Sequence, residues 1–177
     1  MSQFGGATTI GPDVRLMLLD CFETMVELDG TSYRPRLGMI EFLTHFGARV
    51  GIPIAVISDA KKTEVETALA QARLGTFVVK IYHVDNAAEK LANGRMRKDL
   101  AVPLADFKIK PTQVVFIGDS PLDAEAAQHH GVQFIRVPRS EDRGFSFASL
   151  ISGPSGYRSQ EFNVTFLDRY DKKDKRP

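Results

Sequence analysis

The sequence of 177 residues predicts a three-layer α/β fold, with about five parallel strands covered by helices on both faces. Two observations support this prediction: short apolar runs alternate with segments of helical periodicity, and several of these runs end in a polar residue. A strand that is apolar on both faces is usually a central strand of a parallel sheet. We expect one domain over residues 13–167, preceded by a flexible lead-in at residues 1–12 and followed by a charged tail at residues 168–177.

Three strands and a hairpin are predicted in the first half of the chain. Val14–Leu19 is apolar except for one arginine, and Ile52–Ser58 and Phe77–Val84 are further apolar runs. The dipeptide Asp29-Gly30, between the first two runs, is typical of a tight hairpin turn. We expect this hairpin to form a short flap over the end of the first strand.

Two helices are predicted between these strands. Leu37–Phe46 has apolar residues at helical spacing, and Gly47 is placed to end that helix. Lys61–Arg73 has a single apolar stripe, and Asp59 can cap its first turn. Each apolar stripe would pack against the sheet.

The alternation continues in the second half of the chain. We expect a short helix and a loop over Asp85–Gly94, then a helix over Lys98–Phe107 that Pro103 limits to two short pieces. Two apolar runs, Val114–Gly118 and Val132–Val137, predict the fourth and fifth strands.

A strong helix start follows the fourth predicted strand. The run Ser120-Pro121-Leu122-Asp123 provides a serine N-cap, a proline at the first helical position and an acid at the third, and Gly131 ends the helix. After the fifth strand the pattern weakens. There we expect only a helical turn over Phe145–Ile151 and an edge strand over Phe162–Leu167.

Composition narrows the class of protein. The formal net charge is +1, so no global field favours a nucleic acid or a membrane, and the basic residues of the tail are interleaved with acids. The single cysteine, Cys21, excludes an intramolecular disulfide and fits a reducing compartment. No apolar run approaches the roughly 20 residues of a membrane span, and the N-terminus lacks the pattern of a secretory signal. We therefore expect a cytoplasmic protein.

Three of the predicted strands end in side chains that suit phosphate chemistry: Asp20, Ser58 and Asp119. The carboxyl ends of parallel strands lie side by side, at the edge where open α/β sheets bind ligands. Magnesium prefers oxygen ligands, and a carboxylate can attack phosphorus to form an aspartyl-phosphate. These residues predict a site for a hard cation and a phosphate, although Asp20 taken alone could simply cap a turn.

The same residues carry a resemblance to a known family. Residues 20–25, DCFETM, resemble the first motif of the haloacid dehalogenase (HAD) superfamily, Asp-x-Asp-x-Thr-Leu. Ser58 resembles the second motif, and residues 118–123, GDSPLD, are similar to the fourth, Gly-Asp-x-x-x-Asp. Together the motifs extend from Val14 to about Arg139. The resemblance implies a Rossmann-like (HAD-like) sheet and a two-step, magnesium-dependent phosphoryl transfer.

The resemblance implies a role for each matching residue. Asp20 would be the nucleophile, and Mg²⁺ would be held by its carboxylate, by Asp119 and by the backbone carbonyl of Phe22. Thr24 and Ser58 would hold phosphate oxygens.

The metal-site role of Asp123 and the identity of the third motif, a lysine, are less determined. Asp123 would be a metal-site acid, or else an acid that the helix dipole favours in a first turn. A lysine would neutralise charge on the phosphoryl group. We choose Lys98, because it precedes a helix leading to the fourth strand, while Lys90, Lys108 and Lys110 remain alternatives.

One departure from the family pattern concerns the reaction. HAD phosphatases carry a second Asp two residues after the nucleophile as general acid and base, and here Phe22 occupies that position. General acid–base catalysis is typically worth about 10²–10⁴-fold, so esters with poor leaving groups would react slowly. Glu23 is adjacent, but in an extended backbone it would point away.

Three functions follow from this departure. The first is a magnesium-dependent phosphohydrolase that is slow or selective for activated phosphates, such as acyl or aryl phosphates. The second is a non-catalytic or regulatory binding protein that keeps the fold. The third is a dehalogenase-type hydrolase, which the metal-type fourth motif fits poorly.

No sizeable cap domain is expected. The intervals from Asp20 to Ser58 and from Ser58 to Lys98 are each about 40 residues long and are filled by the predicted strands and helices. An open site suits a large or macromolecular phosphorylated substrate, or closure by a partner subunit in a homo-oligomer.

The cysteine and a pair of adjacent histidines have explanations that require neither catalysis nor metal binding. A cysteine-phosphatase signature needs an arginine six residues after Cys21, where Glu27 stands, so Cys21 is predicted to be a small buried residue. His129 and His130 are adjacent, which places them on different sides of a helix and argues against a shared metal. Their position in the last helical turn is favoured by the dipole alone.

Overall fold

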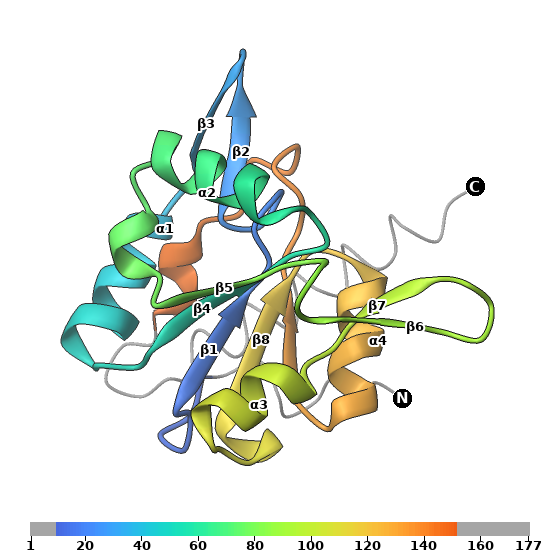
Figure 1. Ribbon diagram of the computed structural model, residues 1–177. Helices are drawn as coiled ribbons and strands as arrows, with labels where there is room; N and C mark the ends of the chain where they lie inside the picture. The colour runs from blue at the N-terminus through green and yellow to red at the C-terminus, as the bar shows by residue number, and fades with distance from the viewer. Residues whose placement is uncertain (1–9, 152–177) are drawn as a thin grey trace.

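Five parallel strands form the central sheet of the computed structural model, which describes residues 10–151 (Figure 1). In spatial order they are β5 (Lys80–Tyr82), β4 (Ile54–Ile57), β1 (Leu16–Leu19), β8 (Val114–Gly118) and β9 (Gln133–Arg136). All five predicted strands are confirmed. β1 lies at the centre of the sheet, and each of its side chains is fully buried.

Helices cover both faces of this sheet. One face packs against α1 (Met39–Leu43), the π-helical turn that continues it (Thr44–Arg49) and α2 (Lys62–Gln71). The other face packs against α3 (Ala101–Phe107) and α4 (Pro121–His130). Alternate residues of β1 belong to the two apolar clusters, as the period of a strand requires. The predicted three-layer architecture is confirmed.

The register of the sheet aligns the strand ends that the sequence marked as polar. Leu19 of β1 pairs with Val56 of β4 and with Ile117 of β8. The Asp20 amide then donates a hydrogen bond to the carbonyl of Ile117 at 3.0 Å. The residues that follow β1, β4 and β8 therefore lie at one edge of the sheet.

A hairpin stands above that edge. It consists of β2 (Val26–Asp29) and β3 (Ser32–Pro35), and it projects beyond the carboxyl ends of the strands in Figure 1. The predicted Asp29-Gly30 turn is confirmed, and Gly30 has a φ of +67°, in the left-handed region that glycine adopts most easily.

The predicted helix over Asp85–Gly94 is wrong. The chain forms a second hairpin there, with β6 (Ala88–Lys90) and β7 (Met96–Lys98) joined through Gly94 at a φ of +82°. Asn93-Gly94 is a hairpin signal in the sequence, but good helix formers such as Ala and Glu surround it. Pairing between the strands, and contact with α4, outweigh that helix propensity.

Three local predictions also need correction. Gly47 does not end its helix: it lies inside the π-helical turn, where a Cβ would come 2.9 Å from Ile54 Cδ1, so glycine permits close packing. Asp59 does not cap α2: Lys61 is the N-cap, and its amide donates to the Glu64 carboxylate at 3.2 Å. Pro103 does not divide α3, because it lies in the first turn, where a backbone N–H has no helical acceptor.

Three short 3₁₀ turns complete the described chain: Gly75–Phe77, Pro111–Gln113 and Phe147–Leu150. The last confirms the helical turn predicted near residue 147, whereas the predicted edge strand over Phe162–Leu167 and the charged tail lie outside the described residues. None of the helices in residues 10–151 has the length and apolar character that a membrane crossing requires.

Candidate active site

Lys98 joins the predicted site residues at the carboxyl edge of the sheet. Its Nζ lies 2.9 Å from Oδ1 of Asp20, which follows β1, and 2.6 Å from Oδ1 of Asp123, in the first turn of α4. Oxygen atoms of Asp20, Asp119 and Asp123 all lie within 4.8 Å of one another. Ser58, buried after β4, follows the strand next to β1. The structure thus brings together acids from two separate segments and a lysine from a third.

The contact identifies which lysine belongs to this site. Lys98 ends β7 and its side chain is only 3% exposed, whereas Lys90, Lys108 and Lys110 are exposed. Its Nζ also lies 5.5 Å from the centre of the Phe116 ring. Lys98 therefore reaches the acidic cluster from the end of the second hairpin, and α3 follows it as expected.

Burial and neighbouring charges set the ionisation of the cluster. Burial raises the pKa of Asp20 to about 6, against the opposing effect of Lys98, and the charge of Asp119 adds to the rise. Burial likewise raises the pKa of Asp123 to about 7. Burial alone would lower the pKa of Lys98, but Asp20 and Asp123 hold it above its ordinary value, so the lysine stays protonated.

The cluster has more negative than positive charge. Three carboxylates lie near two cations, because Lys98 contacts Asp20 and Asp123, and Arg139 contacts Asp119. Oδ2 of Asp123 is buried without a hydrogen-bond partner. An unpartnered buried carboxylate oxygen is costly, and a bound cation would relieve that cost. Oxygen donors in this arrangement suit Mg²⁺, so the residues present fit the metal that the sequence analysis expected.

Asp119 has two partners at the site. The Thr24 hydroxyl donates to its Oδ1 at 3.4 Å, and Arg139 Nε donates to its Oδ2 at 3.2 Å. Thr24 is fully buried and its hydroxyl contacts Asp119, whereas the sequence analysis expects it to hold a phosphate oxygen. Arg139 was missed, and the signal for it was a basic residue soon after the fifth strand, at the edge of the sheet where two other strands are followed by acids.

The spacing of the fourth motif has a steric cause. Ser120 Oγ accepts a hydrogen bond from the Asp123 amide at 3.1 Å, which confirms the predicted N-cap. The cap directs the Asp123 carboxyl group back over Gly118, where an added Cβ would overlap Oδ2 and lie 3.0 Å from Cγ of Asp123. A residue without a side chain is therefore needed at position 118.

Phe22 and Glu23 take no part in the acidic cluster. The Phe22 ring packs edge-on against Tyr33 of the β2–β3 hairpin, with centroids 5.2 Å apart. Glu23 has a φ of +59°, so the backbone is not extended as assumed, and its carboxylate accepts hydrogen bonds from Ser140 N and Oγ at 2.9 and 2.6 Å. Glu23 is directed away from the cluster, as predicted, but by a left-handed turn.

Phe22 also lines an open hollow of about 550 Å³ beside the site. Its other lining residues come from the hairpin and from the start of α2: Tyr33, Ala60, Thr63, Glu64 and Thr67. The hollow is thus lined by both aromatic and polar side chains, and its residue at position 22 has no transferable proton.

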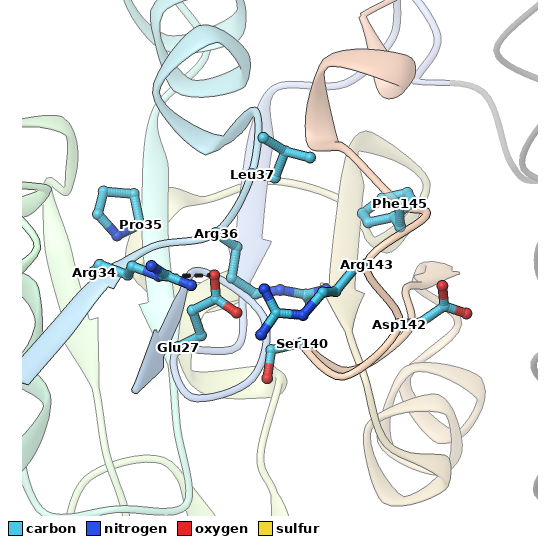
Figure 2. Close-up of a pocket in the computed structure, with 9 residues that line it drawn as sticks. All are labelled: Glu27, Arg34, Pro35, Arg36, Leu37, Ser140, Asp142, Arg143 and Phe145. Carbon is cyan, nitrogen blue, oxygen red and sulfur yellow. Dashed lines mark hydrogen bonds and ion pairs between the residues drawn. The ribbon is translucent and has the colours of Figure 1, made fainter. Parts of the chain in front are cut away.

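Buried Arg36 ties the first hairpin to the loop after β9. Its Nη1 donates to the carbonyls of Glu23 and Pro138, both at 2.6 Å, and its guanidinium lies 5.6 Å from the centre of the Phe147 ring. Arg36 also lines a cavity of about 410 Å³ between these two segments (Figure 2). These bonds hold in place the segments that carry Glu23 and Arg139.

Cys21 is a structural residue, as predicted. Its side chain is fully buried, and burial together with the neighbouring Asp20 carboxylate raises the pKa of the thiol to about 12. A thiolate nucleophile is therefore excluded at ordinary pH.

Replacing Lys98 should destabilise the protein strongly. We expect Lys98→Met to lower the free energy of unfolding by about 3–5 kcal/mol, because it leaves buried carboxylates without their cation. Lys90→Met removes an exposed lysine of the same hairpin and should change stability by less than about 0.5 kcal/mol. Urea denaturation measures both, and equal small effects would show that the buried contact is not stabilising.

The comparisons with known proteins identify a family for this chain. The sequence matches the family model of haloacid dehalogenase-like hydrolases over residues 11–131. No curated protein is significantly similar to the chain in sequence.

Solved structures share the fold at low sequence identity. A predicted phosphoglycolate phosphatase from Haemophilus somnus has a TM-score of 0.63 and 13% identity, over 78% of this chain and 97% of that one. A protein from Listeria monocytogenes has a TM-score of 0.60 and 16% identity, over 88% and 99% of the two chains. CbbY from Rhodobacter sphaeroides, in complex with phosphate, has a TM-score of 0.56 and 21% identity, over 71% and 59%.

Identities this low show the fold alone, whereas the family model covers more than half of the sequence. The protein therefore belongs to the haloacid dehalogenase-like hydrolases.

Proposed function

We propose that the protein is a magnesium-dependent phosphohydrolase that works through an aspartyl-phosphate on Asp20. The observation that carries this proposal is the contact of a buried, protonated lysine with the Asp20 carboxylate, 2.9 Å away, at the carboxyl edge of the sheet. An anionic phosphoryl group placed against Asp20 would meet the charge of Lys98. The family membership and the phosphatase-type folds similar to this chain agree with the proposal.

The metal would be held by this chain's own oxygen donors. We assign Asp20, Asp119 and the backbone carbonyl of Phe22 as ligands, with Asp123 close to the metal or in contact with it. When bound, Mg²⁺ would neutralise negative charge on the phosphoryl group and so favour attack by a carboxylate.

The proposed reaction has two displacement steps. A carboxylate oxygen of Asp20 attacks phosphorus, and the bond between phosphorus and the leaving-group oxygen breaks. Water then attacks the phosphorus of the aspartyl-phosphate, which releases inorganic phosphate and restores the carboxylate. Lys98, Ser58 and Thr24 would hold the phosphate oxygens during both steps, with Thr24 turning its hydroxyl from Asp119 towards the substrate.

Phe22 determines which substrates would react fast. A leaving group that departs as a weak base, such as a carboxylate or a phenolate, needs no proton from the enzyme. An alkoxide does need one, and neither Phe22 nor Glu23, which is bonded to Ser140, can deliver it. We therefore propose acyl or aryl phosphates as the substrate class, with the leaving group in the hollow beside Phe22 and Tyr33.

Phe22 also supports a second candidate function, that of a non-catalytic member of the family that uses the site for binding. A dehalogenase-type reaction is the third, and it would proceed without a cation. The site is open at the hollow beside Phe22, which allows a large substrate or a second subunit to cover it.

The proposal predicts turnover that depends on both the metal and Asp20. We expect hydrolysis of acetyl phosphate and p-nitrophenyl phosphate with Mg²⁺, loss of activity in EDTA, and a decrease in kcat of about 10³-fold or more in Asp20→Asn. Asp85→Asn, at a side chain that is 76% exposed, is the matched control and should retain activity. Activity that survives EDTA would contradict the dependence on the metal, and inactivity on both substrates would favour the second and third candidates over the first.

Restoring an acid at position 22 should widen the range of substrates. We expect Phe22→Asp to increase turnover of an alkyl phosphate by about 10²-fold or more, because the leaving group then receives a proton, and to change acetyl phosphate turnover little. Phe22→Asn is the matched control, since it has the same shape but no transferable proton. An equal gain in both variants would show that the size of the side chain, not proton transfer, limits the reaction.

A further inference from the structure

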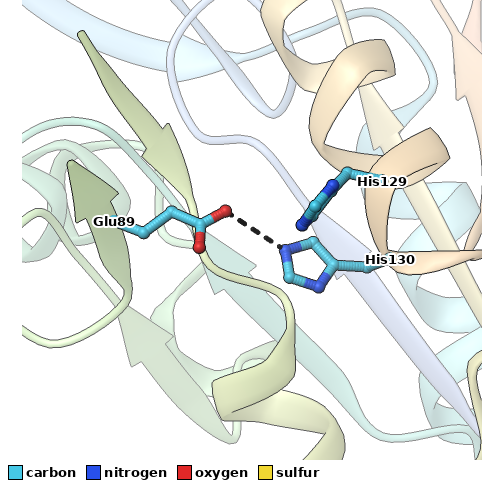
Figure 3. Close-up of side chains that lie close together, drawn as sticks. All are labelled: Glu89, His129 and His130. Atoms are coloured by element: carbon cyan, nitrogen blue, oxygen red, sulfur yellow. Dashed lines mark ion pairs between the residues drawn. The ribbon is translucent and has the colours of Figure 1, made fainter. Parts of the chain in front are cut away.

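Glu89, His129 and His130 form a second cluster of potential metal ligands, outside the acidic site. One ligand atom from each of the three lies within 4.8 Å of the other two. Figure 3 shows both imidazole rings, on the last turn of α4, beside the Glu89 carboxylate on β6. The expectation that the two histidines face different sides of the helix is wrong, because their rings lie 4.8 Å apart at its end.

The distances suit a small cation between the side chains. His130 Nε2 lies 3.7 Å from Glu89 Oε1 and 3.8 Å from Asp99 Oδ1, both too long for a hydrogen bond. Ligand atoms bound about 2.0–2.1 Å from one tetrahedral Zn²⁺ lie roughly 3.4 Å apart. Small side-chain rotations would therefore bring these atoms to binding distance.

His130 has an unused lone pair or proton at this point. Its Nε2 is buried and has no hydrogen-bond partner, and such a buried nitrogen needs an explanation. A metal ion bound to this nitrogen would supply the partner that it lacks.

The Glu89 carboxylate is held in place by an arginine, which bonds to the same oxygen that lies near His130. Arg97, its partner across the hairpin, donates to Glu89 Oε1 through Nε at 2.7 Å and Nη2 at 2.6 Å. Carboxylates that bind metals are commonly oriented by hydrogen bonds of this kind. Glu89 would therefore lose little side-chain freedom on binding a cation.

We propose that Glu89, His129 and His130 form a binding site for Zn²⁺ or a similar transition metal, with Asp99 as a further oxygen donor. Imidazole nitrogens select such metals over Mg²⁺, which prefers oxygen. This site differs from the acidic site in both its donors and its metal.

A metal bound at this cluster would join two elements of the fold. Glu89 and Asp99 lie on the segment that carries Lys98, and the histidines end the helix whose first turn carries Asp123. A metal bound here would fasten the β6–β7 hairpin to α4. It would thereby hold together the two elements whose side chains form the Lys98–Asp123 ion pair.

Zinc titration of the full chain, without an affinity tag, tests this proposal. Calorimetry in excess Mg²⁺, which would occupy the acidic site, should show one Zn²⁺ per chain. The affinity should fall by at least about 100-fold in His129→Asn and in Glu89→Gln, since even outer partners of a metal are worth about 10- to 100-fold. His129 is exposed, so its replacement should not disturb folding.

Two further measurements make the result specific. His45→Asn changes a histidine outside the cluster and should bind Zn²⁺ as the wild type does. Co²⁺ bound in place of Zn²⁺ should give the visible absorption of a site with nitrogen ligands, and Asp20→Asn should not alter it. The proposal is overturned if the wild type binds no Zn²⁺ in excess Mg²⁺, or if His129→Asn and Glu89→Gln both retain its affinity.

Discussion

The buried ammonium group of Lys98 is the interaction on which the site depends. It contacts Asp20 at the end of the central strand and Asp123 in the first turn of α4, in surroundings where burial raises the pKa of both acids. Each element nearby has a part in this arrangement. The aligned strand ends position Asp20, the N-cap and Gly118 position Asp123, and the second hairpin delivers the lysine.

The sequence predicted the features that depend on residues close together in the chain. Apolar runs located all five strands, and the polar residues that end three of them located Asp20, Ser58 and Asp119. Long-range contacts were out of reach. The β6–β7 hairpin depends on packing against α4, and the bonds of Arg36 and Arg139 join segments about 100 and 20 residues apart. Lys98 was chosen because it precedes a helix, and α3 does follow it, but the hairpin that places it beside Asp20 was not predicted.

Phe22 affects proton transfer in the reaction but not the charged groups of the site. Proton transfer to the leaving group requires a titratable side chain within hydrogen-bond reach, and the ring packs instead against Tyr33. Charge stabilisation by Lys98 does not depend on that missing acid. An enzyme with this site would thus rely on the chemistry of its substrate for the step that a general acid normally assists. This reliance on the leaving group of the substrate explains why activated phosphates form the proposed substrate class.

The central claim is that Asp20 carries the phosphoryl group. The most direct measurement mixes the protein with Mg²⁺ and acetyl phosphate, stops the reaction in acid within milliseconds, and locates the modification by mass spectrometry of the peptides. We predict one phosphoryl group on Asp20, which hydroxylamine removes as it does from other acyl phosphates. Turnover of acetyl phosphate without any adduct, or with an adduct on another residue, would contradict the claim.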